Sequence, residues 1–320
     1  MKIGALIAAA GLPESNSTCG PLDNIGTITA IERIVATLRN AGISRIVAVT
    51  GHNSDELERL LTSSHVIFIK NENYETTDML ESVKHGLRYL QGKCDRILFT
   101  PADLPLFTSN TIQSLLLSNS PIAVPVCKGV PGHPVLFSAD YIEDILSYRG
   151  DGGLQEAFRW AGGTTDYVEV DDRGILVDEI PGSSDEYQKL LNLHNRNLVR
   201  VNLRIGLARE KIFFDEQVFT LLMLIDETGN VREACNRMHI SYTTSWNLIQ
   251  RLENELHCPL VARTKGGLKG SHSELTAQGK EFLELYARFT EELRTEASAL
   301  FRKRFRDFFK MDQPEQGCSE

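Results

Sequence analysis

Three pieces near the start of the chain decide the fold: KIGALIAA at 2–9, IERIVATLRNAG at 31–42 and SRIVAVTG at 44–51. The first and third are short and almost continuously apolar, which is typical of strands buried on both faces. The middle piece has apolar residues at helical spacing and is closed by Gly42. A strand, a helix and a strand in this order predict two parallel strands joined by a crossover helix.

The same alternation continues along the chain. It predicts strands at 65–71 and 95–103, and helices at 55–61, 78–90 and 109–118. Strands that are apolar along their whole length belong in a sheet that helices cover on both faces. The pattern therefore predicts a doubly wound α/β domain over residues 1–195.

Length and composition are those of a soluble, two-domain protein. With 320 residues the chain exceeds the usual size of one hydrophobic core, although a single large α/β fold stays possible. No apolar run approaches the roughly 20 residues of a membrane helix, and the apolar start leads into a strand rather than a signal peptide. Six cysteines without CxxC spacing indicate free thiols, so we expect a cytoplasmic protein without membrane contact.

Loops that follow strands are the first places to search for a ligand site, because open parallel sheets bind ligands at the carboxyl ends of their strands. After the first strand, Ala8–Gly11 consists of small residues, which let backbone N–H groups approach phosphate oxygens. Small residues also let a strand and a helix pack closely, so both interpretations stay open at this loop.

A carboxylate follows the strand at 95–103. Asp103 stands between two prolines that stiffen the loop. It suits Mg²⁺, which prefers oxygen ligands and bridges phosphates, although a solvated loop aspartate is the plain alternative. Glycines are also dense at 129–136 and 150–153, where either a ligand-binding loop or a simple hairpin would use them.

Together these segments resemble the MobA-like nucleotidyltransferases of molybdenum-cofactor maturation. The resemblance runs through AAAG, PLDNIGTITAIERIV, VTGHNSDELERLL, NENYETTDMLESVKHGL, FTPADLPL, GHPVLF and GDGGL. It implies that the domain binds CTP or GTP with Mg²⁺ and transfers a nucleotidyl group to a phosphorylated acceptor. It assigns nucleotide contacts to Ala9, Ala10, Gly11, Asn71 and Ser82, acceptor contacts to Gly132, His133 and Pro134, and the metal to Asp103.

The chain departs from that family at two places. Family enzymes continue the opening loop as AAGxSxRMGxxK, whose Arg and Lys neutralise triphosphate charge; here Ser15, Ser17 and Gly20 stand at the Arg, Gly and Lys positions. The second metal carboxylate of the family lies in a DxDTPxD segment, where VDEIPGSSDEY offers only Asp178 in a comparable place. Both departures favour a domain that binds a ligand without efficient turnover.

Beyond His194 the alternation stops, and the rest of the chain is predicted to be mostly helical apart from one short hairpin. After a helix over 215–225, Asn230 caps the next helix with Glu233 at the third position, in the manner of a capping box. Ser241 then caps SYTTSWNLIQRLENEL. Two helices joined by a tight turn, the second beginning at a serine cap, are typical of a helix-turn-helix.

The second of these helices has an apolar and a polar face. Its inward positions at helical spacing are Trp246, Ile249, Leu252 and Leu256. Its outward positions, which suit base edges and phosphates in a major groove, are Thr243, Thr244, Asn247 and Arg251. An ordinary amphipathic helix is the alternative. The basic hairpin predicted behind it favours DNA, because a local cluster of cations matters more for phosphate binding than the net charge of −9. The cations of this hairpin are Arg263, Lys265 and Lys269.

This half resembles the DNA-binding domain of the molybdate-responsive ModE-type regulators and, more loosely, the LysR-type winged domain. The resemblance rests on ISYTTSWNLIQRLE, TKGGLKG and LTAQGKEFLELY. The molybdate-binding domain of those regulators finds no counterpart after the last helix, so we do not expect molybdate sensing by the family route.

A long last helix is predicted from Ala277 to about Phe308. Its apolar stripe consists of Phe282, Leu285, Tyr286, Phe289 and Leu293. The stripe can bury against its own domain or against a second copy, and the length of the helix favours a homodimer, which would place two recognition helices about one DNA turn apart. We predict a linker at 196–203, a winged helix-turn-helix domain at 204–310 and a flexible tail at 311–320.

Three functions stay open at this point. The favoured hypothesis is a homodimeric transcriptional regulator whose α/β domain senses a nucleotide or a molybdopterin-type metabolite. Its rival is an active nucleotidyltransferase that also binds DNA, and a third possibility is an α/β domain that serves only as a scaffold for dimerisation.

Overall fold

The computed structural model describes residues 1–11, 19–61, 64, 66–176, 185–199, 201–238, 240–264, 272–305 and 307–309. The chain divides into two compact units. The first unit comprises residues 1–200 and 301–320, and the second unit comprises residues 201–300. Each has its own hydrophobic core. No helix in the described ranges is long and apolar enough to cross a membrane.

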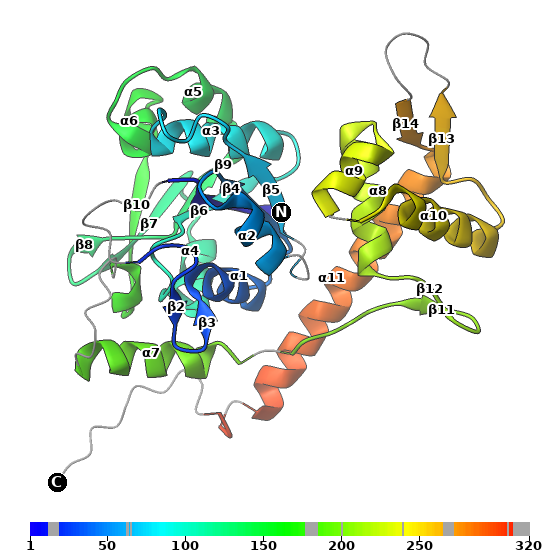
Figure 1. Cartoon of the computed structure of the whole chain (residues 1–320). Helices are drawn as coiled ribbons and strands as arrows, with labels where there is room; N and C mark the ends of the chain where they lie inside the picture. Colours follow the sequence, from blue (N-terminus) through cyan, green and yellow to red (C-terminus); the bar gives the residue numbers. More distant parts are fainter. Residues whose placement is uncertain are drawn as a thin grey trace. The chain divides into compact units, whose positions relative to one another are not determined.

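The first unit is built on a mixed sheet with the strand order β10-β7-β9-β6-β1-β4-β5, and β8 pairs with β7 (Figure 1). The strands are β1 (Ile3–Ala9), β4 (Arg45–Thr50), β5 (Ile67–Lys70), β6 (Arg96–Pro101), β7 (Ile122–Cys127), β8 (Val130–Pro131), β9 (Val135–Ser138) and β10 (Thr165–Glu169). Strands β6, β1, β4 and β5 run parallel, as predicted, whereas β9 is antiparallel to both β6 and β7. The doubly wound α/β class is confirmed, with the antiparallel strand β9 inserted between β6 and β7 and β8 antiparallel to β7.

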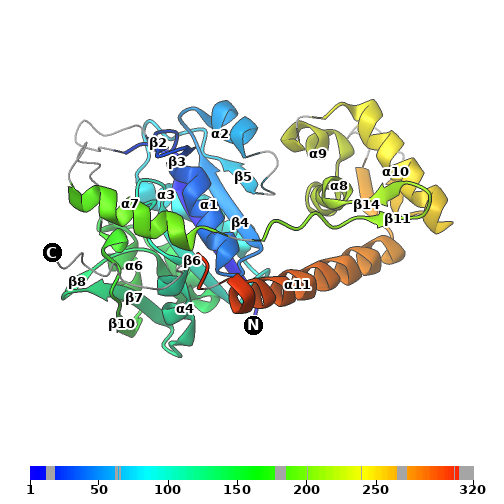
Figure 2. The ribbon, with the colours of Figure 1, turned by 90° about the horizontal axis from the view of Figure 1, so that it is seen from below.

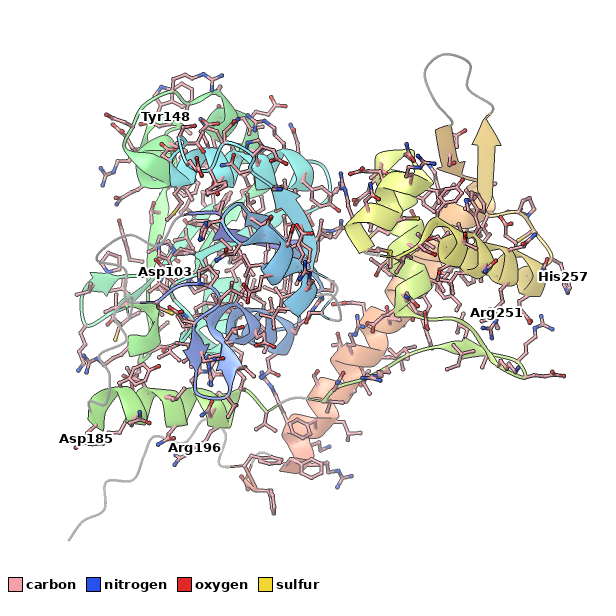
Figure 3. All side chains as sticks on the ribbon, in the orientation of Figure 1. Asp103, Tyr148, Asp185, Arg196, Arg251 and His257 are labelled. Carbon is pink, nitrogen blue, oxygen red and sulfur yellow. The ribbon has the colours of Figure 1, made fainter. Side chains whose placement is uncertain are left out.

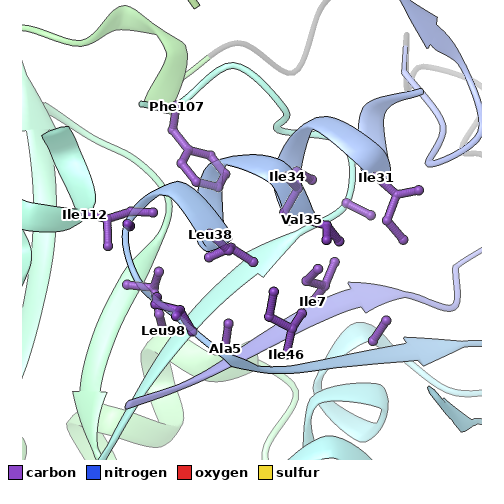
Figure 4. Packing of buried hydrophobic residues seen from close by; sticks show 14 of the residues in the cluster. Ala5, Ile7, Ile31, Ile34, Val35, Leu38, Ile46, Leu98, Phe107 and Ile112 are labelled. Carbon is purple, nitrogen blue, oxygen red and sulfur yellow. The ribbon is translucent and has the colours of Figure 1, made fainter. Parts of the chain in front are cut away.

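Helices cover both faces of this sheet. On one face, α1 (Ala30–Asn40), α2 (Ser54–Leu60) and α4 (Ser109–Leu117) pack on the strands. Figure 4 shows Ile31, Ile34 and Leu38 of α1 above Ala5 and Ile7 of β1. Their i, i+3, i+7 spacing puts these side chains on one side of the helix, which explains why this stretch buries a single stripe.

Helix α1 begins at a complete capping box. The Thr29 hydroxyl accepts a hydrogen bond from the backbone N–H of Glu32 at 3.4 Å, and the Glu32 carboxylate accepts one from the backbone N–H of Thr29 at 2.8 Å. This pair satisfies backbone donors that the first helical turn leaves without partners.

The opposite face is covered by α3 (Met79–Leu90), α5 (Ile142–Ser147) and α6 (Gly153–Trp160). Helix α3 lies very close to β1, because a Cβ atom added at Gly86 would come within 2.2 Å of the Leu6 side chain. Shorter elements of the unit are β2 (Asn24–Ile25), β3 (Ile28–Thr29), and the 3₁₀ turns η2 (Ala139–Tyr141) and η3 (Arg173–Ile175).

Helix α7 (Asp185–Asn197) is docked on α1 and on the β2–β3 hairpin (Figure 2). The buried Arg33 guanidinium donates to the Ile25 carbonyl at 2.7 Å and to the Asn195 amide oxygen at 2.8 Å. It also lies 3.1 Å from Nδ1 of the buried His194. The helix runs two residues past the predicted boundary at 195, because these polar contacts and Asn40 hold its last turn on the first unit.

The second unit holds the helices α8 (Glu216–Thr228), α9 (Val231–Met238), α10 (Tyr242–Leu256) and most of α11 (Ala277–Phe305). It also holds two hairpins, β11 (Leu207–Ala208) with β12 (Ile212–Phe214), and β13 (Val261–Thr264) with β14 (His272–Leu275). The first of these hairpins corrects the expectation of a single one. Phe214 of β12 is fully buried between Phe282 and Tyr286 of α11, so this hairpin belongs to the core.

Candidate functional site

The first candidate site lies at the carboxyl edge of the sheet, where β1 ends between β4 and β6. Ala9 and Ala10 are buried there, and Gly11 is exposed, with no atom of the described residues within 4 Å of where its Cβ would stand. The Ala10 carbonyl accepts a hydrogen bond from the His52 backbone N–H at 3.2 Å. The small residues at 9 and 10 therefore serve close packing, and Gly11 is the position that leaves backbone open to an approaching phosphate.

Asp103 is placed at the same edge by β6 (Figure 3). The backbone N–H of Ala102 donates to the Ala8 carbonyl at 3.0 Å, which ties the Asp103 loop to the end of β1. Asp103 is half-buried, and its charge acts on Cys19 at the far end of the loop that leaves β1. Burial first, then Asp23 and Asp103, raise the pKa of the Cys19 thiol to about 12.

The charge at this point of the loop is negative. The backbone N–H of Gly20 donates to the Asp23 carboxylate at 2.6 Å. Two carboxylates, Asp23 and Asp103, therefore act on this segment and would repel an anionic group that approaches it. A bound divalent cation would relieve this excess of negative charge.

The described residues do not form a complete metal site by themselves. Among them, no group of three or more His, Cys, Asp or Glu side chains is arranged to hold an ion. Asp178, the predicted second metal ligand, lies outside the described residues, as do Ser15 and Ser17.

Asn71 and Ser82, both predicted to border the nucleotide, are brought together by the fold and are buried. The Asn71 amide donates to the hydroxyl of Ser82 at 3.1 Å and to that of Thr77 at 2.9 Å. Its oxygen accepts from the backbone N–H of Asn73 at 3.0 Å. These bonds use the hydrogen-bonding groups of the Asn71 amide to shape the loop between β5 and α3.

Gly132, His133 and Pro134, the predicted acceptor residues, lie between β8 and β9. The start of the glycine-rich stretch at 129–136 belongs to the hairpin of β7 and β8, the alternative that the sequence left open, with Lys128 and Gly129 at its turn in left-handed conformations. A Cβ at Gly132 would come within 2.3 Å of the Ile175 carbonyl. Glycine is therefore required there by the approach of η3, whatever else binds nearby.

His133 is the most unusual polar side chain of this region. Its ring stands edge-on to Phe99, with 5.6 Å between the ring centroids. Burial lowers the pKa of His133 to about 4, against the opposing effect of a hydrogen bond to the Phe99 backbone. Its Nδ1 atom is buried and has no hydrogen-bond partner among the described residues, so the neutral ring offers one unused nitrogen.

The second candidate site is the outward face of α10, which we call the recognition helix. Ser241 caps it, because its hydroxyl accepts from the backbone N–H of Thr244 at 3.1 Å. Ile249 and Leu252 are fully buried, and Trp246 and Leu256 pack on the core at partial burial. All four outward residues of the sequence prediction are exposed, and we call them the DNA face: Thr243, Thr244, Asn247 and Arg251.

The preceding helix α9 begins at the expected Asn230 cap, although one bond of the predicted capping box differs. The Asn230 side chain accepts hydrogen bonds from the backbone N–H groups of Arg232 at 2.8 Å and Glu233 at 3.4 Å. The expected reciprocal bond of a capping box is not formed. Glu233 instead pairs with Arg237 at 3.1 Å, and Thr228 accepts from the backbone N–H of Asn230.

The stem of the predicted wing is the β13–β14 ladder, which pairs Val261 with Leu275 and Thr264 with His272. The backbone N–H of Ser273 donates to the Gly229 carbonyl at 2.9 Å, so β14 is tied to the turn between α8 and α9. Arg263 lies on β13, and its side chain, like Lys265 and Lys269, falls outside what the structure describes.

The structure adds an aromatic residue that the sequence prediction missed. Tyr242, the first residue of the recognition helix, is 47% exposed and lies edge-on to Trp246. The Arg232 guanidinium stands 5.9 Å above its ring. Its position directly after the Ser241 cap was the available signal, because the first turn of this helix is exposed.

Comparison with known proteins agrees with this geometry. Residues 5–166, just over half of the chain, match the family described as MobA-like NTP transferase domain. The chain belongs to the MobA-like NTP transferase family. Residues 217–280 match the helix-turn-helix of bacterial regulatory proteins of the lysR family, a range that includes α9, the recognition helix and the wing stem.

Individual relatives divide between the two units. The MobA-like part is 28% identical over 137 residues to "Molybdenum cofactor cytidylyltransferase" of Escherichia coli, covering 42% of this chain and 69% of the relative. The second part is 27% identical over 78 residues to "Transcriptional regulator ModE" of Haemophilus influenzae, covering 24% of this chain and 31% of the relative. The chain thus spans about a third of the length of that regulator.

A solved structure supports the fold of the MobA-like domain. The nucleotidyl transferase from Methanothermobacter thermautotroptrophicus superposes with a TM-score of 0.50 at 21% identity, covering 61% of this chain and 98% of that one. This likeness shows the fold alone, because the identity is low.

Proposed function

We propose that this chain is a cytoplasmic, DNA-binding transcriptional regulator linked to molybdenum metabolism, whose MobA-like domain binds a nucleotide or a molybdopterin-type ligand. The observation that carries the proposal is the DNA face. Four polar side chains project from a helix that is capped, anchored in a core and followed by a wing stem. Exposed hydroxyl, amide and guanidinium groups in this setting suit base edges and phosphates.

For the MobA-like domain we propose CTP or GTP as the nucleotide, bound with Mg²⁺. Gly11 offers open backbone for the phosphates, and Asp103 offers a carboxylate at the same edge of the sheet. When bound, Mg²⁺ would bridge phosphate oxygens and offset the negative charge of Asp103 and Asp23. A phosphorylated acceptor would lie against Gly132, His133 and Pro134, as the sequence predicts.

We further propose a homodimer built on α11. Leu285, Phe289 and Leu293 of its predicted stripe are 54%, 46% and 39% exposed, whereas Tyr286 is buried and donates to the Ile205 carbonyl at 2.7 Å. One side of the stripe is thus used by the unit itself, and the other presents apolar surface suited to a second copy. A pair of recognition helices would then match two half-sites.

Calorimetric titration of the full chain tests the ligand proposal. With Mg²⁺ present, CTP or GTP should give a saturable heat that Asp103→Asn strongly reduces, because that substitution removes the charge and keeps the shape. Asp140→Asn, on the exposed 3₁₀ turn η2, is the matched control and should bind as wild type. No saturable heat with either nucleotide or with a molybdopterin-type compound would leave the domain a scaffold.

An active nucleotidyltransferase fused to a DNA-binding domain is the second candidate, because Asp103 is retained at the strand end. Pyrophosphate release from CTP or GTP with Mg²⁺ and a pterin acceptor distinguishes the two. The regulator proposal expects little release, since Gly20 stands in place of a cation. Rapid release that Asp103→Ala abolishes would replace the sensor with an enzyme.

A further inference from the structure

Glu253 of the recognition helix does not face the same way as the DNA face. Its carboxylate Oε1 accepts two hydrogen bonds from the backbone, from the N–H of Leu260 at 2.7 Å and from the N–H of Val261 at 3.0 Å. Val261 is the first residue of β13, where the wing stem begins. At about 100° per residue, Glu253 lies roughly 200° around the helix from Arg251. One helix therefore holds the wing on one side and presents Arg251 on the other.

Leu260 and Val261, whose N–H groups donate to Glu253, also make backbone contacts with the other strand of the wing stem. The Leu260 carbonyl accepts from the backbone N–H of Thr276 at 2.8 Å, and Val261 pairs with Leu275 in the ladder. A Cβ at Gly279, in the first turn of α11, would come within 2.5 Å of that same carbonyl. The direction of the stem relative to the recognition helix therefore depends on this short segment.

The chain changes direction at the end of the recognition helix, so contacts are needed to hold the segment that follows. His257 adopts a left-handed conformation, with φ of 54°, at the end of the recognition helix (Figure 3). Left-handed backbone is unfavourable for a residue with a Cβ, so neighbouring contacts must hold it. Charge-assisted bonds from one carboxylate to two adjacent N–H groups are among the stronger contacts available.

The other acidic residue of this end of the helix is also engaged. Glu255 lies 3.3 Å from the Arg209 guanidinium on the β11–β12 hairpin, and the Arg209 side chain is 64% exposed. Glu255 therefore provides a comparison for Glu253: an acid two residues away on the same helix, with a partner on the surface and no bond to the wing stem among the contacts described.

We propose that Glu253 is a positioning residue for DNA binding, which fixes the wing stem relative to the recognition helix so that the two can contact one duplex together. This inference rests on the proposed DNA-binding function. It reverses the simple electrostatic expectation, since removing a negative charge near DNA ordinarily strengthens binding. Here the loss of an acid weakens binding, because the wing stem is no longer held in place.

The test measures binding of the full chain to a mixed-sequence duplex of about 30 base pairs, long enough for two recognition helices one turn apart, over a series of salt concentrations. Glu253→Ala should weaken binding about tenfold and lower the salt slope by about one for each bound subunit, as when each subunit loses one wing contact with phosphate. Glu253→Gln keeps an oxygen that accepts both N–H groups and should bind within about twofold of wild type. Glu255→Ala should bind as tightly as wild type or more tightly.

Thermal unfolding of each variant separates positioning from general loss of structure. A combination of Glu253→Ala with Lys265→Ala should be less than additive, because both act through the wing. Tight binding by Glu253→Ala with an unchanged slope would overturn the inference, as would equal losses in the Ala and Gln variants or full additivity with Lys265→Ala. Failure of the wild-type chain to bind any duplex is a different result, which would count against the proposed function itself.

Discussion

In the first unit, most polar side chains near the candidate site are buried. In the second unit, the polar side chains of the DNA face are exposed to solvent. Asn71 and Ser82 are buried and bonded to each other, and His133 is enclosed against Phe99. Thr243 and Arg251 of the DNA face are exposed. A small ligand is recognised within an enclosed edge of a sheet, but a duplex requires side chains that project from the surface.

Because of this difference, the same type of substitution should affect stability in the first unit and partner binding in the second. Removing a buried, bonded group leaves its partners unsatisfied and costs stability. Removing an exposed group costs little stability and shows its effect only when the partner binds. The following predictions use this contrast, beginning with the largest effect.

Arg33→Met should destabilise the first unit by about 2–6 kcal/mol, because it leaves two acceptors of the buried guanidinium, the Ile25 carbonyl and the Asn195 oxygen, without their donor. Arg251→Met is the matched control in the second unit and should change the free energy of unfolding by less than about 0.5 kcal/mol. Urea unfolding of both variants checks this. Similar costs for the two arginines would contradict the comparison.

Acid should destabilise the first unit through its buried histidines. Burial first, then the charge of Arg33, lower the pKa of His194 to about 3, and burial lowers that of His133 to about 4. In the unfolded chain histidine titrates near 6.5, so the unfolded state takes up protons that the folded state refuses. The free energy of unfolding therefore keeps its full value above about pH 6.5. It falls by about 1.4 kcal/mol per pH unit for each histidine as the pH drops toward 4.

Thermal unfolding between pH 7 and pH 5 measures that effect, and His194→Gln should flatten the dependence. The substitution removes the titrating group but keeps an acceptor for Arg33. Unfolding that does not respond to pH over this interval would show that the rings are not held neutral.

Arg251→Ala should weaken DNA binding by about 1–3 kcal/mol and relax the preference among sequences if its guanidinium reads a base. Gln250→Ala, at the neighbouring exposed position, removes no charge and should have a smaller effect. Fluorescence anisotropy with several duplexes checks the prediction. Unchanged affinity in Arg251→Ala would contradict the placement of the recognition helix in the major groove.

The smallest effect is expected for Lys265→Ala. As a phosphate contact it should weaken binding almost equally on all sequences and reduce the salt slope by about one. A loss confined to one sequence would instead make Lys265 a base-reading residue and blur the division between helix and wing.

Much of the fold could be predicted from local patterns. The strands β1, β4, β5 and β6 and the helices between them agree with the predicted ranges to within about two residues at each end, because buried strands and amphipathic helices have distinct periodicities. Strand β9 and the β11–β12 hairpin were missed. Short strands carry little periodic signal, and the antiparallel course of β9 depends on partners that are distant along the chain.

The two candidate sites likewise differ in how much of each could be predicted from local patterns. The DNA face followed from helical spacing after a serine cap, which is a local property. The roles of Asn71 and Gly132 did not, because the hydroxyl of Ser82 and the carbonyl of Ile175 that explain them lie far away in sequence. No pattern in the sequence indicates that Glu253, rather than Glu255, holds the wing stem.

By itself, the sequence determined that a doubly wound α/β domain is joined to a helix-turn-helix, since apolar periodicity and caps act over a few residues and survive in any environment. Only the tertiary structure decided which polar groups are available to a partner. Hydrogen bonds such as those of Arg33 and Glu253 join segments that meet only when the chain is folded, and each bond made inside the protein removes a group from those that can bind a ligand or DNA.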